Sequence, residues 1–435
     1  MSVAPAVLAA VREHLIALDA APEPAAVLAA LRAQGEVMSA AGLATLVTDL
    51  RAELAGAGPL EPLLIEPGIT DVLVNGPREV WCDRGAGLER SGIHFVDEAS
   101  VRRLAQRLAM RAGRRLDEAA PFVDAQLPSG VRLHAVIPPI AEATHISLRV
   151  PGSRHLSLGD LLRQGGLGEP ARWWLTALIR ARVSLLITGG TGSGKTTLLS
   201  ALLGCAGPGE RIVIVEDAPE LNPSHDHVVR LCGRPPNVEG AGAVTLTDLC
   251  RQALRMRPDR LIVGEVRGRE VIDLLTALNT GHEGGAATVH ANSAADAPAR
   301  IAALALAAGL DRPAAHTYLL TGVGAIVHVL RTRQGDGTIL RRPHGIDVLV
   351  AGATPDCAEV LPAVRFLPHT SVGGESRDGM TGAVAAGAVG AGAPGEAAAG
   401  DGAAGVDRLL TEAGDPPGIR RGPGFTRLLT LLGSP

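Results

Sequence analysis

Residues 183–199 read V-S-L-L-I-T-G-G-T-G-S-G-K-T-T-L-L. An apolar run of strand length, 183–188, leads into a segment that matches G-x-x-x-x-G-K-[ST] in full, and an apolar segment of helical character follows. A phosphate-binding loop requires this order of strand, glycine-rich loop and helix. The glycines let backbone N–H groups turn toward phosphate oxygens, and the helix N-terminus attracts the same anion. The alternative, a glycine-rich turn with a stray lysine, leaves the full motif and both flanks unexplained.

The loop predicts a nucleotide site that binds ATP with Mg²⁺. Lys195 is expected to reach the β- and γ-phosphates, and the Thr196 hydroxyl is expected to help hold Mg²⁺. The residues predicted to contact the nucleotide are Gly189, Gly190, Thr191, Gly192, Ser193, Gly194, Lys195, Thr196 and Thr197.

Composition excludes several classes of protein. The net charge of -4 gives no basic field for nucleic acid, and aromatic residues make up only 2% of the 435 residues, so the core must be aliphatic. The five cysteines are scattered without a C-x-x-C pair, which indicates reduced thiols and no zinc knuckle. A signal-peptide pattern is absent, and no apolar stretch is long enough to span a bilayer. These features predict a cytoplasmic protein.

The residue spacing and composition along the chain predict that it has four parts. Residues 1–57 carry leucines at helical spacing and form a helical module, either a simple packing or oligomer arm or a docking domain. Residues 58–150 mix short strands with an arginine-rich helix and form a small α+β domain. Residues 151–350 hold the nucleotide domain. Residues 351–435 are mostly a disordered Ala/Gly-rich tail, with a short helix near 406–412.

The nucleotide domain has the pattern of an α/β fold. Apolar runs at 183–188, 211–216, 260–264 and 286–290 alternate with helical segments, which predicts a mostly parallel, doubly wound sheet with ligands at the carboxyl ends of its strands. Residues 325–330 and 346–350 are expected to be closing strands.

Two of these strands end in carboxylates. Residues 211–220 read R-I-V-I-V-E-D-A-P-E and place Glu216 at a strand end; residues 260–267 read R-L-I-V-G-E-V-R and place Glu265 there. An acid at this position can orient Mg²⁺ or the attacking water. Glu265 is expected to take that role through metal-bound water or as general base, since Gly264 stands where many P-loop enzymes have Asp. Glu216 could share the role, or could be a helix cap or a surface acid, and Arg267 could be catalytic or a salt-bridge partner.

Residues 280–292 read T-G-H-E-G-G-A-A-T-V-H-A-N. His282 and His290 could form a zinc pair, but no third ligand stands at motif spacing. Thr288 and Asn292 accompany His290 and are suited to sensing a γ-phosphate.

The order of these four motifs resembles the type II/IV secretion ATPase superfamily over about residues 60–350. Within it, the likeness is greatest to the Tad/Flp-pilus assembly ATPases of the CpaF/TadA type, including actinobacterial members labelled conjugal-transfer-associated. The segment 114–132, R-R-L-D-E-A-A-P-F-V-D-A-Q-L-P-S-G-V-R, is also similar to that branch. The resemblance implies a RecA-like ATPase domain behind a smaller N-terminal domain, a hexameric ring, and ATP between the two domains.

The resemblance also assigns individual residues. Glu216 matches the aspartate-box acid of the family, Glu265 its Walker B acid and His290 its histidine-box residue. Arg132 and Arg149 match arginines that reach the phosphates from the N-terminal domain. The tetracysteine zinc site of some pilus-extension and type II secretion members has no counterpart in this sequence.

The function expected from the sequence is that of a cytoplasmic motor ATPase at the inner face of the cell membrane. It would act on an inner-membrane platform protein to assemble a pilus or secrete a substrate. One alternative is a conjugal DNA-transfer motor of the same superfamily, although nucleic acid is not an expected partner because the chain has no basic excess. The other alternative is a nucleotide-binding regulatory protein with little turnover.

Overall fold

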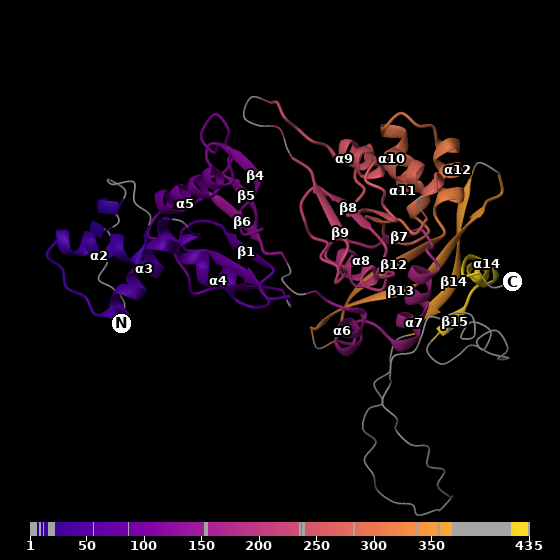
Figure 1. The fold of residues 1–435 in the computed structure, drawn as a ribbon, viewed down its shortest axis with the longest axis horizontal. Helices are drawn as coiled ribbons and strands as arrows, with labels where there is room; N and C mark the ends of the chain where they lie inside the picture. Colours follow the sequence, from indigo (N-terminus) through magenta and orange to yellow (C-terminus); the bar gives the residue numbers. More distant parts are fainter. Residues whose placement is uncertain are drawn as a thin grey trace, which may run out of the picture. The chain divides into compact units, whose positions relative to one another are not determined.

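The computed structural model describes residues 7, 10–11, 13–15, 22–54, 56–85, 87–151, 155–234, 236, 240–281, 283–335, 337–354, 357–367 and 419–433. The chain divides into two compact units, which are described one at a time (Figure 1). The first comprises Met1–Ser153 with Asn237–Ala241, and the second comprises Arg154–Pro236 with Gly242–Pro435.

The first unit begins with two helices that share a small aliphatic core, α2 (Pro24–Ala33) and α3 (Ala40–Leu54). Leu31 and Leu50 are almost fully buried in it, so the helical spacing of the leucines corresponds to one packed face. The short helices η1 (Gly58–Leu60) and α4 (Glu61–Ile65) lead into the sheet that follows.

The sheet of the first unit is antiparallel and is packed against the helix α5 (Glu98–Arg111). Its strand order is β3-β2-β1-β6-β5-β4. The strands are β1 (Asp71–Val74), β2 (Val80–Asp83), β3 (Leu88–Arg90), β4 (Phe122–Gln126), β5 (Arg132–Val136) and β6 (His145–Arg149). Helix α5 begins at Asp97, whose carboxylate accepts a hydrogen bond from the N–H of Ser100. Leu104 and Leu108 of α5 pack against one face of the sheet, and the other face carries the polar residues of the strands.

The second unit is built on a nine-stranded sheet of order β15-β14-β13-β12-β7-β11-β10-β8-β9. The strands from β12 to β9 run parallel, and β13, β14 and β15 close the sheet in antiparallel fashion. The strands are β7 (Leu185–Thr188), β8 (Ile212–Glu216), β9 (Val228–Cys232), β10 (Arg260–Val263), β11 (Ala286–Val289), β12 (Ala325–Arg333), β13 (Ile339–Ala351), β14 (Ala358–Phe366) and β15 (Ile419–Arg421). Every residue of β7, β8, β10 and β11 is buried, as expected of parallel strands covered on both faces. The predicted α/β, RecA-like fold class is confirmed.

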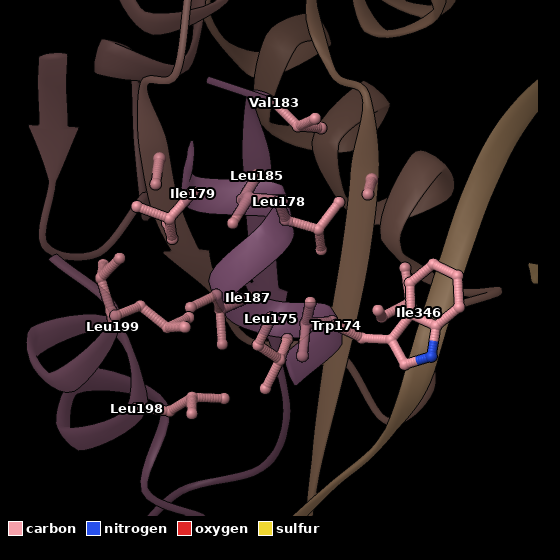
Figure 2. Packing of buried hydrophobic residues seen from close by; sticks show 14 of the residues in the cluster. Trp174, Leu175, Leu178, Ile179, Val183, Leu185, Ile187, Leu198, Leu199 and Ile346 are labelled. Atoms are coloured by element: carbon pink, nitrogen blue, oxygen red, sulfur yellow. The ribbon is translucent and has the colours of Figure 1, made fainter. Parts of the chain in front are cut away.

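Helices cover both faces of this sheet. One face carries α6 (Leu158–Arg163), α7 (Glu169–Arg180), α8 (Lys195–Leu203) and α14 (Phe425–Leu431). The other carries α9 (Leu246–Leu254), α10 (Glu270–Asn279), α11 (Ala297–Ala307) and α12 (Arg312–Gly322). Figure 2 shows Leu175 and Leu178 of α7 beside Leu185 and Ile187 of β7, with Trp174 next to them. This packing fixes β7 and α8, the two elements that flank the glycine-rich loop.

Residues 351–435 were predicted to be a mostly disordered tail, and this prediction is wrong near both ends of the segment. Strand β14 pairs with β13, and β15 with α14 returns to the same sheet, where Leu428 is fully buried. Strand β14 was not predicted from the sequence, because it contains Pro362 and proline is rare inside a sheet. Pro362 stands opposite Asp347, next to a register shift that accommodates it. The disorder predicted for 371–405 and the helix predicted near 406–412 lie outside the described residues.

Candidate nucleotide site

The glycine-rich loop joins β7 to α8 in a conformation that its glycines permit. Gly192 and Gly194 have φ angles of 67° and 94°, in the left-handed region that favours glycine. A Cβ atom at Gly189 would lie 2.5 Å from the carbonyl oxygen of Val329 and 2.7 Å from Ser193 Oγ. The loop is therefore tightly packed against β12 and cannot accept a side chain at its first position.

Lys195 is the only lysine of the chain and lies inside the loop. It is 7% exposed, and its Nζ donates hydrogen bonds to the carbonyls of Gly189 and Gly190 at 3.0 and 3.1 Å. Burial lowers the pKa of Lys195, and the neighbouring Glu265 acts against that shift. The loop therefore surrounds the ammonium group of Lys195. Thr196 and Thr197 follow at the start of α8, partly exposed and exposed respectively.

Glu265 lies at the edge of the sheet beside His290. The strands β10 and β11 pair in parallel, so the residues that follow them meet at the same edge. Glu265 Oε1 is 2.6 Å from His290 Nε2, and the guanidinium of Arg267 forms an ion pair with Glu265 Oε2. Burial, followed by the nearby Lys195, lowers the pKa of His290, so its ring is neutral near pH 7. The two groups are in close contact, but the contact lacks hydrogen-bond geometry, since Glu265 Oε1 has no hydrogen-bond partner among the described residues.

Glu270 supports this arrangement and was not identified from the sequence. It is the first residue of α10 and 6% exposed. One of its carboxylate oxygens accepts hydrogen bonds from the backbone N–H groups of Arg267 and Gly268, at 2.6 and 2.7 Å. It therefore fixes the turn that follows Glu265. An acid at a helix start was the available signal.

Glu216 lies at the end of β8 and is 4% exposed. Its Oε1 accepts hydrogen bonds from the backbone N–H groups of Leu221 and Glu220 at 2.9 and 3.1 Å. Burial raises the pKa of Glu216 to about 7 despite these bonds. The charges of Glu265 and Glu220 oppose the lowering of the Lys195 pKa by burial.

Gly264 makes room for Glu216. A Cβ atom at Gly264 would lie 2.6 Å from Glu216 Cγ and 3.0 Å from its Oε1. The position where many P-loop enzymes have an Asp is therefore filled here by a side chain from the neighbouring strand β8.

Gly264→Ala is accordingly expected to lower the free energy of unfolding by about 1–3 kcal/mol, because the added methyl group must displace Glu216. Urea unfolding measures the change. Gly209→Ala is the matched control, since a Cβ atom there would meet nothing within 4 Å. Equal stability of the parent and Gly264→Ala would show that the Glu216 side chain can move aside without a loss of stability.

The polar residues on β11 and after it have different surroundings. Thr288 is buried, and its hydroxyl donates to the carbonyl of Gly264 at 2.6 Å, so it joins β11 to β10. Its expected role as a γ-phosphate sensor stays a prediction. Asn292 lines a pocket of about 260 Å³ together with Gly190, His290, Ala291, Asp296 and Arg300.

The zinc pair considered for His282 and His290 cannot be placed, because His282 lies outside the described residues. Within the described ranges no cluster of three or more His, Cys, Asp or Glu residues could hold a metal ion.

Arg132 and Arg149 belong to the first unit, where the antiparallel register of β5 and β6 places them directly opposite each other. Arg149 is also opposite Asp71 of β1. Directly opposed residues share one face, which here is the one opposite to Leu133 and Leu148 of the core.

None of the helices that the structure describes is sufficiently long and apolar for a membrane span.

Comparison with known proteins gives the family. Residues 53–333 match the family described as "Type II/IV secretion system protein". The chain is 56% identical over 293 residues to a "Putative conjugal transfer protein" of Mycobacterium tuberculosis, covering 66% of this chain and 83% of that protein. It is 37% identical over 259 residues to the "Type IV secretion system protein PtlH homolog" of Bordetella bronchiseptica, covering 54% and 76%. Among solved structures, the VirB11 ATPase of the Brucella suis type IV secretion system, in complex with sulphate, matches with a TM-score of 0.35 and 28% identity, over 66% of this chain and 91% of that one. The match over residues 53–333 shows that the chain belongs to the type II/IV secretion system protein family.

Proposed function

We propose that the protein is a motor ATPase of a type II/IV secretion system that hydrolyses ATP to ADP and phosphate. One observation carries the proposal: the buried Lys195 lies inside a complete phosphate loop, and Glu265 follows β10 at the same edge of the sheet, with its Oε1 2.6 Å from His290 Nε2. A cation within the loop fits a triphosphate, and an acid at a strand end of the same edge fits a water molecule attacking its last phosphorus.

Each residue of the site has its own role in the proposed hydrolysis of ATP. Lys195 and the loop N–H groups bind the β- and γ-phosphates and stabilise the charge that develops during transfer. Thr196 and Glu265 would hold Mg²⁺, which supplies further neutralisation of the phosphate charge when bound. Glu265 orients the attacking water and accepts its proton, with His290 in close contact with its carboxylate. Glu216 could share the proton-accepting role, because a pKa of about 7 suits a base near neutral pH.

Assembly and location belong to the same proposal. A hexameric ring, docked on an inner-membrane platform protein at the cytoplasmic face of the membrane, would couple turnover to movement of a pilus or secreted substrate. The family match and the relative named as a type IV secretion system protein support this assignment. Action of Arg132 and Arg149 on the phosphates stays a prediction that rests on the family resemblance.

A conjugal DNA-transfer motor is the second candidate, and the name of the mycobacterial relative favours it. The net charge of -4 offers no general attraction for DNA. The two candidates differ in whether single- or double-stranded DNA raises the ATPase rate of the purified protein. A regulatory protein with little turnover would bind ATP and release no phosphate.

The proposed function is tested with Lys195→Ala. The variant is expected to bind ATP at least about tenfold more weakly than the parent and to lose turnover, because the loop loses its cation. Titration with a fluorescent nucleotide and steady-state phosphate release measure the two effects. Light scattering with a non-hydrolysable ATP analogue then measures ring formation.

The parent offers an independent check because Lys195 is its only lysine. ATP is expected to protect Lys195 from an amine-reactive reagent, as read by mass spectrometry, while the N-terminal amine reacts equally with and without ATP. Equal labelling of Lys195 in both conditions, with unchanged binding by Lys195→Ala, would reject the nucleotide site. Binding without turnover or ring formation would favour the regulatory alternative.

A further inference from the structure

The hairpin β12–β13 extends past the end of β7 and lies against the phosphate loop. Strand β12 pairs in parallel with β7 up to Thr188, which stands opposite His328. Beyond that point β7 gives way to the loop, while β12 continues to Arg333. Strand β13 accompanies this extension and places Arg341 directly opposite Arg331. Strand pairing alone thus brings two arginines beside the loop.

Both arginine side chains approach the glycines of the loop. Arg341 Nε donates a hydrogen bond to the carbonyl of Gly192 at 2.9 Å. A Cβ atom at Gly192 would lie 3.8 Å from Arg331 Nη1, and one at Gly194 would lie 3.5 Å from Arg341 Cδ. Arg331 and Arg341 are exposed, so solvent, and a ligand, can reach them.

Two guanidinium groups beside a phosphate loop suit an anionic ligand. The planar fork of arginine matches phosphate geometry, so a phosphate oxygen next to both groups fits this pair. The backbone N–H groups of the loop point at the same kind of ligand.

The strand order decides which part of the nucleotide lies there. The order β12-β7-β11-β10 puts the hairpin on one side of the loop and the Glu265–His290 pair on the other. A nucleotide whose γ-phosphate is next to Glu265 therefore presents its α-phosphate end to the hairpin. We propose that Arg331 and Arg341 bind the α-phosphate of the nucleotide. This inference rests on the nucleotide site proposed above, and neither residue belongs to the motifs that identify the loop.

Arg331→Ala tests the inference most directly, because Arg331 has no hydrogen bond to the loop carbonyl that its loss would break. The variant is expected to bind ADP and ATP about tenfold more weakly, by the same factor for both, since both nucleotides carry an α-phosphate. Its KM for ATP should rise by that factor while kcat changes less than about twofold, which is the pattern of lost uniform binding. Arg341→Ala should act in the same direction.

Arg333→Ala is the matched control, because Arg333 lies two residues farther out on the same face of β12. It should bind both nucleotides like the parent. If Arg331→Ala folds poorly, Arg331→Gln replaces it, and the melting temperature without nucleotide verifies that the fold is intact. Rescue of binding by Arg331→Lys would confirm a contact through charge.

The outcomes separate the two proposals. A parent that binds neither ADP nor ATP rejects the nucleotide site itself. A parent that binds both, with Arg331→Ala and Arg341→Ala binding equally well, overturns the α-phosphate contact alone. Weaker binding of ATP with unchanged binding of ADP also overturns it, because the contact would then be to the γ-phosphate.

Discussion

Glu265→Gln is expected to bind ATP within a few-fold of the parent and to reduce kcat by about 10²- to 10⁴-fold, the usual contribution of a general base. The amide is the same size as the carboxylate and can still contact His290. It cannot accept a proton from water, and it no longer forms an ion pair with Arg267. Titration of ATP binding and single-turnover phosphate release separate the binding step from the chemical step.

Glu220→Gln is the matched control for this variant. Glu220 also acts on the Lys195 charge, but the His290 contact at 2.6 Å belongs to Glu265. Removal of its charge should change kcat only a few-fold. If Glu265→Gln hydrolyses ATP at the rate of the parent, Glu265 does not activate the water, and Glu216 becomes the leading acid.

Glu216→Gln is expected to gain stability relative to the parent as pH rises, by about 2.5 kcal/mol between pH 5 and pH 8.5. Burial raises the pKa of Glu216 from 4.5 to about 7. The native state therefore keeps its proton over a pH range in which the unfolded chain has lost it, so the parent loses stability as pH rises from about 4.5 through 7. The glutamine does not ionise, and its oxygen can accept the same backbone N–H groups of Glu220 and Leu221.

Urea unfolding at several pH values measures this difference. Glu283→Gln removes an exposed carboxylate and controls for the loss of one negative charge. Its stability should follow that of the parent at every pH. A difference between Glu216→Gln and the parent that stays constant from pH 5 to 8.5 would show that Glu216 ionises normally in the folded protein.

The parts of the fold that could be predicted from the sequence are those with strong local signals. The apolar run before Lys195 and the runs before Glu216 and Glu265 correspond to β7, β8 and β10, because buried parallel strands are continuously apolar. The strands β3 and β4 were not predicted, because they are short and most of their residues are exposed. Strand β14 was not predicted for a different reason, since it contains Pro362 and proline is rare inside a sheet.

The sequence indicated residues that follow strand ends but gave no sign of contacts that depend on pairing between distant segments. Glu265 and His290, each chosen from its place at a strand end, lie 2.6 Å apart, and their roles stay predictions. The contact of Arg341 with Gly192 joins residues 149 positions apart and depends on the register of two strands, which no local pattern reveals. The hydrogen bond from the Thr288 hydroxyl to the carbonyl of Gly264 likewise depends on the pairing of β11 with β10, which the sequence did not reveal.

The strand order of the second unit also bears on how quickly the protein can fold. The loop is anchored by β7, which pairs with β11 and β12 rather than with the next strand in sequence. The contact between Thr188 and His328 closes a chain segment of 140 residues. Closing such long segments delays folding, since the chain loses entropy before the contacts compensate for it. We therefore expect slow refolding in which competence to bind nucleotide appears late, after helical circular dichroism has recovered.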